Sequence, residues 1–181
     1  MAENRETLAS VLVRPGLAGD LAAVAEVHVR SWQETYVSQV PQEYLEDLSV
    51  EGRLRGWAEM TAGWEWPNPD LHVLVDDDGK VVGFATTSPS RDSDASDSTG
   101  EVPSIYTRKD AWGRGNGRAL MTAALDRLRQ SGYETATLWV LDTNTRARRF
   151  YEAGGWAWDG TSKGHQIGGA AVTELRYRII L

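Results

Sequence analysis

The glycine-rich stretch Trp112–Gly117, Trp-Gly-Arg-Gly-Asn-Gly, constrains the fold of this chain more than any other. It follows a β-like segment at residues 102–107 and precedes a helix-like segment that begins at Arg118. Glycines at every second position let the backbone adopt positive φ angles and approach a ligand closely. The amino-terminus of a helix offers unpaired N–H groups and the positive end of its dipole, which suits a phosphate. The stretch therefore predicts a phosphate-binding turn between a strand and a helix.

This interpretation has an alternative, because an ordinary strand-to-helix turn explains the same glycines. The stretch is not a nucleotide P-loop, since no Gly-Lys-Ser/Thr follows, and it is not a clean Gly-x-Gly-x-x-Gly fingerprint. Arg114 and Arg118 add positive charge. A second stretch, described below, favours the phosphate interpretation.

Composition limits the class of protein. The 181 residues are 41% hydrophobic and 25% charged, as is typical of one globular domain, so we expect a single domain over residues 1–181. The net charge of −7 argues against nucleic acid as the main partner and favours a cationic ligand. The chain has no cysteine, and His28, His72 and His165 lie far apart. We therefore expect no disulfide, no cysteine nucleophile and no metal site.

The chain also lacks the sequence signals of a membrane or secreted protein. No apolar run approaches the roughly 20 residues that a membrane helix needs. The first residues, Met-Ala-Glu-Asn-Arg-Glu, have neither the basic region nor the apolar core of a signal peptide. We expect a cytoplasmic protein without a membrane partner.

Hydrophobic periodicity predicts helices and strands that alternate in the middle of the chain, with hairpins at both ends. Expected helices cover 20–34, 41–48, 49 or 51 to 61, 118–131 and 144–153; expected strands cover 10–14, 71–75, 80–87, 101–107, 135–141, 156–158 and 172–180. Asp20 is expected to cap the first helix. Residues 76–79 predict a hairpin turn rather than a calcium loop, and residues 88–100 a solvated, mobile loop. This order indicates an α/β or α+β fold with a mixed sheet.

The second stretch is Leu138–Trp156, which predicts a strand, a turn, a helix and another turn. It resembles the acetyl-CoA-binding region of the GNAT acyltransferases (GCN5-related N-acetyltransferases), with the pattern strand–Asn-x-x-Ala-x-x-Phe-Tyr-Glu-x-x-Gly-Phe. The glycine turn is similar to the family's pyrophosphate loop, Arg/Gln-x-x-Gly-x-Gly. Gly115 and Gly117 match that loop, whereas Trp112 stands in place of Arg/Gln. The two motifs occur in family order and at family spacing.

The resemblance implies a twisted, mixed but mostly antiparallel sheet of about six to seven strands flanked by helices. Pro103 cannot donate a ladder hydrogen bond, so it favours a bulge in the strand at 101–107. In the family such a bulge splays this strand from the next, and the pantetheine arm inserts between them. The implied contacts with acetyl-CoA are Ile105, Tyr106, Thr107, Trp112, Gly113, Arg114, Gly115, Asn116, Gly117, Arg118, Asn144 and Tyr151.

Acetyl transfer to an amine needs a polarised thioester carbonyl, a deprotonated amine and a protonated leaving thiolate. The resemblance implies that Tyr151 is the general acid, although a core tyrosine is the alternative. It likewise implies that Glu101 accepts the amine proton, the alternative being a solvated residue at the end of a loop. The N–H of Ile105 or Tyr106 would polarise the carbonyl. Asn144 is expected to cap its helix and to contact the cofactor arm as well.

The expected function is direct transfer of an acetyl group from acetyl-CoA to a primary amine of a small molecule, without a metal. An acyl-CoA-binding regulatory or pseudo-enzyme domain, and a protein N-terminal or lysine acetyltransferase, stay open as alternatives. A homodimer is compatible with the resemblance. Small amines, amino-acid derivatives, an aminoglycoside-like antibiotic and a protein N-terminus stay open as acceptors. A group of aromatic residues suggests an aromatic wall, although aromatic residues at helical spacing more often belong to the core: Trp32, Tyr36, Trp57, Trp64 and Trp66. His28 lies near the apolar edge of its helix and is expected to be structural.

Overall fold

The computed structural model describes residues 12–181, and its centre is one seven-stranded sheet with the order β1-β2-β3-β4-β5-β7-β6. The strands are β1 (Leu12–Gly16), β2 (Asn68–Val75), β3 (Val81–Pro89), β4 (Thr99–Thr107), β5 (Thr135–Leu141), β6 (Ala157–Ile167) and β7 (Ala170–Ile180). The helices are α1 (Leu21–Thr35), α2 (Gln42–Asp47), α3 (Val50–Met60), α4 (Asn116–Gln130) and α5 (Thr145–Ala153). Neighbouring strands are antiparallel except β4 and β5, which are parallel. The predicted mixed, mostly antiparallel sheet is confirmed.

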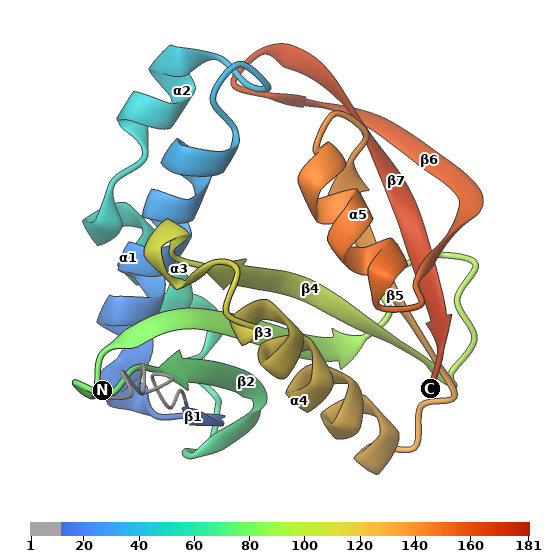
Figure 1. Cartoon of the computed structure of the whole chain (residues 1–181), viewed down its shortest axis with the longest axis horizontal. Coiled ribbons are helices and arrows are strands. Elements are labelled where there is room, and N and C mark those ends of the chain that lie inside the picture. The colour runs from blue at the N-terminus through green and yellow to red at the C-terminus, as the bar shows by residue number, and fades with distance from the viewer. Residues whose placement is uncertain (1–11) are drawn as a thin grey trace, which may run out of the picture.

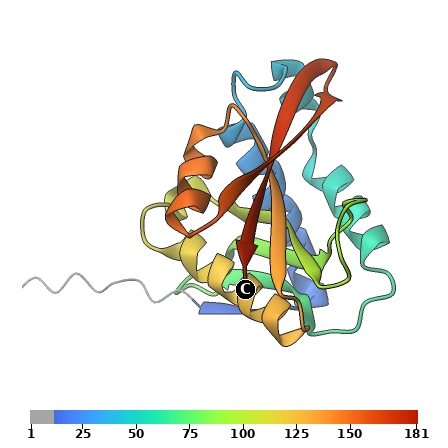
Figure 2. The same ribbon diagram turned by 90° about the vertical axis from the view of Figure 1, so that its right-hand side faces the viewer.

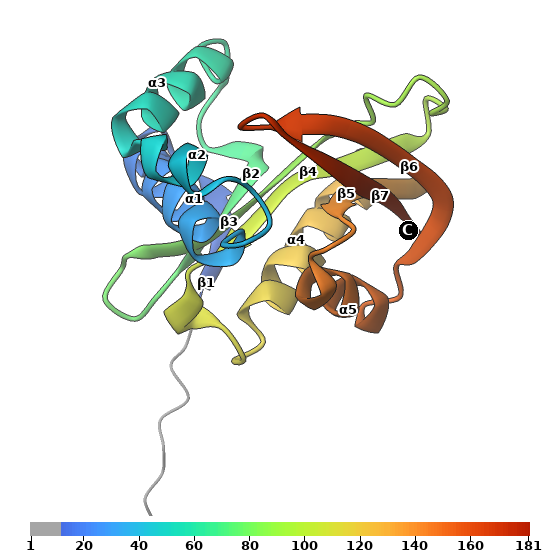
Figure 3. The same ribbon diagram turned by 90° about the horizontal axis from the view of Figure 1, so that it is seen from above.

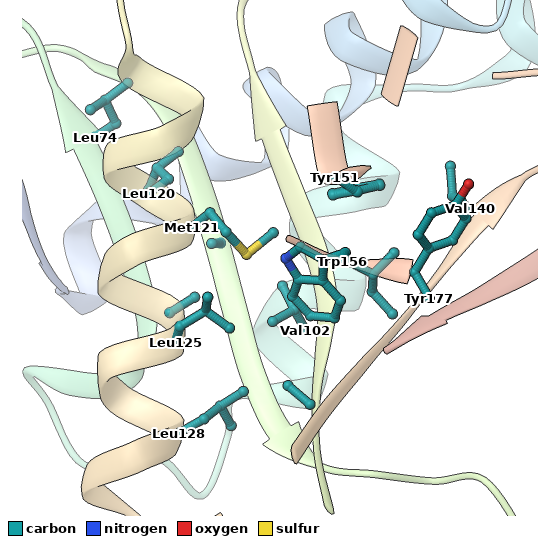
Figure 4. Packing of buried hydrophobic residues seen from close by; sticks show 14 of the residues in the cluster. Leu74, Val102, Leu120, Met121, Leu125, Leu128, Val140, Tyr151, Trp156 and Tyr177 are labelled. Carbon is teal, nitrogen blue, oxygen red and sulfur yellow. The ribbon is translucent and has the colours of Figure 1, made fainter. Parts of the chain in front are cut away.

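The helices cover the two faces of the sheet, with α4 and α5 on one face and α1 to α3 on the other (Figures 1 and 3). The apolar stripe predicted for α4 is buried against the strands, and Figure 4 shows its leucines pointing into that layer. The stripe comprises Leu120, Met121, Ala124, Leu125 and Leu128. Burying such side chains contributes roughly 1.5–3 kcal/mol each, so the helix that follows the glycine turn is firmly held.

The opposite face carries an aromatic core. Trp57 of α3 and Phe84 of β3 pack edge to face with ring centroids 5.3 Å apart. Trp64 and Trp66 pack against this cluster from the loop between α3 and β2. Three of the five residues expected in an aromatic wall therefore lie in or against the core, as their burial and contacts require.

The strands β4 and β5 separate along their length. They pair only at Thr99, Gly100 and Glu101, opposite residues 135–137, and diverge beyond that point (Figure 1). The predicted bulge accompanies the divergence. Between the pairs Thr86–Ser104 and Ser88–Glu101, β3 advances by two residues while β4 advances by three. The extra residue lies in the segment that contains Pro103, as expected of a residue without an N–H.

Two predictions at the amino-terminal end were wrong in detail. The first strand does not stop at Pro15, since β1 continues to Gly16, and residues 10–11 lie outside the described part. The Asp20 side chain does not cap α1. Its carboxylate instead accepts a hydrogen bond from the Leu17 N–H at 2.8 Å and pairs with Arg14 at 2.7 Å. The Arg14 hydrogen bonds lower the pKa of Asp20, so this carboxylate is committed to the preceding turn.

The loop expected over residues 88–100 is shorter and more firmly attached than predicted. The strands β3 and β4 take up both of its ends, and Thr99 and Gly100 are buried. Its centre is tied to β7, because the Arg176 guanidinium contacts Asp92 at 3.3 Å and Asp94 at 2.6 Å. Two aspartates that suggested solvation in the sequence thus satisfy an almost fully buried arginine.

The last two strands form a long hairpin that reaches across the molecule towards α2 (Figures 1 and 2). Strand β6 extends well beyond the expected 156–158 and begins one residue later, because Trp156 lies in the core before it. At the tip, a Cβ added to Gly168 would lie 2.5 Å from the Tyr44 side chain, so the hairpin packs closely on α2. Within residues 12–181, no helix is long and apolar enough to cross a membrane.

Candidate active site

A cavity of about 840 Å³ occupies the opening between β4 and β5. One end is formed by the glycine turn and the start of α4, and the other by α1, the start of β4 and the β6–β7 hairpin. The bulge and the short β4–β5 pairing create this opening, since a fully paired sheet would leave no space between the strands. This cavity is lined by most of the residues for which the sequence predicted contact with acetyl-CoA.

The glycine turn has the conformation that its sequence predicted. Gly113 and Gly115 have φ angles of 76° and 82°, where a side chain would be strained. The Trp112 N–H bonds to the Lys109 carbonyl, and the next backbone N–H that bonds to an acceptor within residues 12–181 is that of Ala119, which donates to the Gly115 carbonyl. The N–H groups from Gly113 to Arg118 are therefore free to bind an anion. The Asn116 side chain donates to the Ala111 carbonyl at 2.9 Å and holds the turn in place.

Besides Arg118, the turn has a second cation nearby, Arg146, which the sequence motifs did not indicate. The Arg146 guanidinium covers the Trp112 indole, with 3.3 Å from its central carbon to the ring centroid. The indole N–H of Trp112 donates to the Thr107 carbonyl at 3.0 Å, which fixes the plane of the ring. Arg118 and Arg146 both line the cavity, whereas Arg114 does not. Burial lowers the pKa of Arg146, but a guanidinium remains charged in proteins.

The exposed edge of β4 presents backbone groups to the cavity. The Arg108 N–H donates to the Val82 carbonyl at 2.8 Å, across from β3. Because partners in an antiparallel ladder alternate between bonded and non-bonded pairs, Tyr106 also directs its N–H to β3. Ile105 and Thr107 then direct theirs to the opening. Of the two predicted donors to the acetyl carbonyl, the ladder geometry favours Ile105 over Tyr106.

Tyr151 lies on the inward face of α5 and lines the cavity. Only 8% of it is exposed, and Figure 4 shows its ring beside Trp156 and Tyr177. Burial, with a smaller effect from Tyr106, raises the pKa of its hydroxyl. The phenol is therefore protonated at neutral pH, as a proton donor must be. It is both a core residue and a cavity residue, so the two interpretations offered by the sequence are compatible.

Asn144 has the capping role that was predicted for it. Its side-chain oxygen accepts a hydrogen bond from the Ala147 N–H at 3.1 Å, at the start of α5. The residue is 7% exposed and lines the cavity between β5 and α5. Its amide group can therefore contact a ligand while the oxygen caps the helix, because an amide has two donors and a second lone pair on its oxygen.

Glu101 is not the solvated residue that one alternative described, since only 3% of it is exposed. Arg91 surrounds its carboxylate: the backbone N–H at 3.1 Å and the side-chain Nε at 3.2 Å bond to one oxygen, and a terminal nitrogen at 2.6 Å bonds to the other. The arginine side chain is itself 72% exposed. The carboxylate is thus fixed in the cavity wall by a backbone N–H and by a cation whose side chain faces solvent.

The profile of the Acetyltransferase (GNAT) family matches residues 21–156. The chain belongs to this family. The uncharacterized N-acetyltransferase YuaI of Bacillus subtilis (strain 168) is 32% identical over 143 residues, covering 79% of this chain and 78% of that protein. A mycothiol acetyltransferase of Acidimicrobium ferrooxidans is 32% identical over 123 residues, which cover 62% of this chain and 39% of that protein. The chain therefore spans less than half the length of this second relative.

The fold is that of solved GNAT structures. The crystal structure of the PaiA N-acetyltransferase of Thermoplasma acidophilum, in complex with coenzyme A, superimposes with a TM-score of 0.70 at 19% identity. The superposition covers 95% of this chain and 99% of the other. The family resemblance inferred from the two motifs is confirmed.

The GNAT motifs did not identify the far end of the cavity. Of the expected aromatic wall, only Trp32 and Tyr36 line it, and they are joined there by Trp139, Lys163 and Glu174. In the structure, Trp139 stands between two buried residues of β5 and faces the other side of the sheet. Nothing in the sequence indicated that the β6–β7 hairpin would reach this wall.

His28 lies outside the cavity lining, in the aromatic layer of α1. Its ring stacks on Tyr106 with centroids 4.9 Å apart, and its Nδ1 atom is buried without a partner among the described residues. Burial, with a smaller effect from Arg53, lowers the pKa of His28 to about 3. The structural role predicted for this histidine agrees with these contacts.

Proposed function

We propose that this GNAT domain transfers an acetyl group from acetyl-CoA directly to a primary amine of a small molecule. The observation that carries the proposal is the continuity of the cavity. It joins the free N–H groups of residues 113–118 to Tyr151 and Glu101. This continuity supports one path that joins phosphate binding, the acid and the base.

The residues at the turn suit the phosphates of acetyl-CoA. The N–H groups of 113–118 point out of a helix start whose dipole is positive, and Arg118 and Arg146 add charge. From there the pantetheine arm would follow the exposed edge of β4, where Ile105 directs its N–H to the opening. The Asn144 amide lies across the same opening. This arrangement supports binding of acetyl-CoA with its thioester between β4 and β5.

Acetyl-CoA supplies an activated acyl group, and the chain supplies a proton donor for the leaving sulfur and a proton acceptor for the amine. The amine nitrogen forms a bond to the acetyl carbon, and the bond from that carbon to sulfur breaks. Tyr151 donates its proton to the departing sulfur, and the Ile105 N–H stabilises the charge that develops on the carbonyl oxygen. Glu101 accepts the proton that the amine loses, directly or through water.

The pairing with Arg91 bears on the role of Glu101, because the arginine occupies the carboxylate that an amine would approach. The arginine side chain is largely exposed, so an incoming amine can reach this pair from solvent, whereas the buried carboxylate needs a cation beside it. A protonated amine would then exchange one cation for another beside the carboxylate. This contact supports Glu101 as the group that receives the acceptor.

A regulatory domain that binds acyl-CoA without turnover is the rival function, and a protein acetyltransferase is the second. The name of the mycothiol acetyltransferase relative supports a small molecule over a protein as the acceptor. A cytoplasmic location, a homodimer and a single domain over the whole chain stay predictions.

The test combines binding and turnover. The protein is incubated with acetyl-CoA and a panel of primary amines, free thiol is followed with a chromogenic reagent, and CoA binding is measured by thermal shift. We expect CoA to raise the melting temperature, because it binds only the folded state, and thiol release to depend on an amine. Binding without release for any amine would select the regulatory domain, and an absence of binding would contradict the proposal altogether.

A further inference from the structure

The acceptor end of the cavity contains two carboxylates with a common arrangement. Glu101 and Glu174 both line the wall, with side chains only 4% and 22% exposed. Each is paired with a far more exposed cation of this chain. Arg91, at 2.6 Å from Glu101, is 72% exposed, and Lys163, at 3.4 Å from Glu174, is 48% exposed. The carboxylates are thus set in the wall, whereas the cations that cover them face solvent.

An aromatic face completes the second of these positions. The Lys163 ammonium lies 3.8 Å from the centroid of the Trp139 indole. A cation in this position is attracted by the ring as well as by the carboxylate. His165 also lies near, with Nδ1 3.8 Å from the same oxygen of Glu174, and its side chain is 39% exposed. An ammonium group thus already occupies a site of one indole and one carboxylate within the cavity.

The Trp139 ring is held rigidly. Its indole N–H donates to Asp92 at 3.1 Å, and Asp92 in turn contacts Arg176. Arg176 is only 5% exposed and is also bound by Asp94 and Asp159. Because the indole is fixed by this network and not by Lys163, departure of the lysine would leave the aromatic face in place. The site does not depend on its present occupant.

The backbone register explains why these groups meet. Lys163 is directly opposite Glu174 in the β6–β7 ladder, and Glu174 is opposite Leu141 in the β5–β7 ladder. Residues opposite each other in a ladder share a face of the sheet, and every second residue along a strand shares it too. Trp139, Glu174 and Lys163 therefore lie on the same face, the one that forms the cavity wall.

We propose that Trp139 and Glu174 bind a second cationic group of the acceptor, which is therefore a diamine or another amine with a distal positive charge. This inference rests on the proposed function, since it assigns the reacting amine to Glu101. Lys163 occupies the position in the absence of the acceptor and leaves when the distal ammonium enters. The chain's net charge of −7 favours approach of such a molecule.

Two other interpretations make different predictions. If Lys163 only stabilises the hairpin, the distal charge of an acceptor should have no effect. If Lys163 and Arg91 instead receive an anionic group of the acceptor, a distal carboxylate should improve binding. Amines of one chain length that differ only at the distal end therefore separate all three.

The first experiment measures amine affinity by calorimetry on the full chain saturated with CoA, so that no turnover is needed. The probes are 1,6-diaminohexane, n-hexylamine and 6-aminohexanoate, with the four- and eight-carbon diamines and monoamines to find the best length. We expect the best diamine to bind about tenfold more tightly than the monoamine of equal length, as an indole and a carboxylate together can provide. Equal affinities, or tightest binding of 6-aminohexanoate, would overturn the inference.

Two variants test the residues themselves. Glu174→Gln should remove most of the diamine preference, measured as the ratio of the diamine and n-hexylamine affinities in the same variant. Lys163→Met, which removes the occupant and keeps an apolar stem, should maintain or increase the preference; a decrease would contradict the role given to Lys163. The backbone ladder of the hairpin does not depend on either side chain, so we expect both variants to fold. Their melting temperatures check this, and if one variant unfolds the other still provides the test.

The same probes with acetyl-CoA distinguish this inference from the proposed function. Tight diamine binding without thiol release would support the cation site and contradict acetyl transfer. Thiol release at equal kcat/KM for diamine and monoamine would support transfer and overturn the cation site.

Discussion

The Arg146 guanidinium lies over the Trp112 indole, with 3.3 Å between its central carbon and the ring centroid. Arg146 comes from α5 and Trp112 from the turn before α4. Their contact therefore joins the two elements at the end of the cavity where we propose that the phosphates bind. Trp112 stands where the family pattern has Arg or Gln. Arg146 of α5 thus supplies a positive charge beside the position where the family pattern has Arg or Gln.

Replacing Arg146 with Ala should weaken the use of acetyl-CoA selectively. A charge-assisted hydrogen bond to a phosphate contributes roughly 1.5–3 kcal/mol, so we expect kcat/KM for acetyl-CoA to fall by at least about tenfold. Acetyl-pantetheine lacks the phosphates, and its kcat/KM should stay unchanged. Arg114→Ala is the matched control, because that side chain does not line the cavity. An equal loss of kcat/KM with acetyl-CoA and with acetyl-pantetheine would indicate a structural role for Arg146.

Replacing Gly115 with Val should abolish the rise in melting temperature that CoA causes. The φ angle of Gly115 is 82°, and a β-branched residue there costs on the order of 1–3 kcal/mol or forces the turn to change. The altered turn would no longer direct its N–H groups at a phosphate. Gly79→Val provides the comparison, since Gly79 has a φ of 78° in a distant hairpin turn. It should lower stability to a similar extent and leave the CoA effect intact; retention of CoA affinity in Gly115→Val would refute the phosphate turn.

Tyr151→Phe should lower kcat by about 10²-fold, the low end for general acid catalysis. The change keeps the buried ring against Trp156 and Tyr177 and removes only the hydroxyl, so CoA affinity and melting temperature should change little. Steady-state kinetics with a saturating amine measures the effect. A change of less than about threefold would exclude an essential acid, and loss of CoA binding would favour a purely structural tyrosine.

Glu101→Gln should lower kcat more at neutral than at alkaline pH, since a base is least needed when the free amine is abundant. The amide keeps the shape of the carboxylate but accepts fewer hydrogen bonds from Arg91, so the melting temperature must be followed as well. Glu51→Gln, an exposed change on α3, is the control. Profiles of wild type and Glu101→Gln that coincide across the pH range would place the base elsewhere.

His28 should make the fold sensitive to acid. Its pKa is about 3 in the folded state and ordinarily 6.5, so the unfolded chain binds the proton more readily and stability falls as the pH drops from about 6.5 towards 3. At pH 5 the loss due to this residue is about 2 kcal/mol. Urea unfolding at pH 7 and pH 5 should show a smaller decrease for His28→Phe than for wild type. His165→Gln, at an exposed site, should behave as wild type; an equal decrease in all three proteins would contradict the assignment.

Burial also lowers the pKa of His72, so the same sign applies to that residue, and the His28→Phe variant should retain some acid sensitivity. The difference between the two proteins isolates His28, because the remaining titratable groups are common to both.

Local patterns in the sequence determined the elements of the fold. The glycine turn, the apolar stripe of α4 and the Asn144 cap depend on residues within one or two turns of one another, and the structure has all three as predicted. The bulge at Pro103 belongs to the same class, because a residue without an N–H cannot continue a ladder. Such features follow from backbone conformation, which neighbouring residues control.

The contacts between distant segments depended on the tertiary structure. Arg146 reaches Trp112, Arg91 covers Glu101, and Lys163 lies on Trp139 only because the bulge opens β4 from β5 and β7 brings β6 alongside. The same packing divided the tryptophans and tyrosines of the expected wall between the core and the cavity. Composition alone cannot make this division, since an aromatic side chain suits either place. Which strands become neighbours, and in which register, decided where each side chain points.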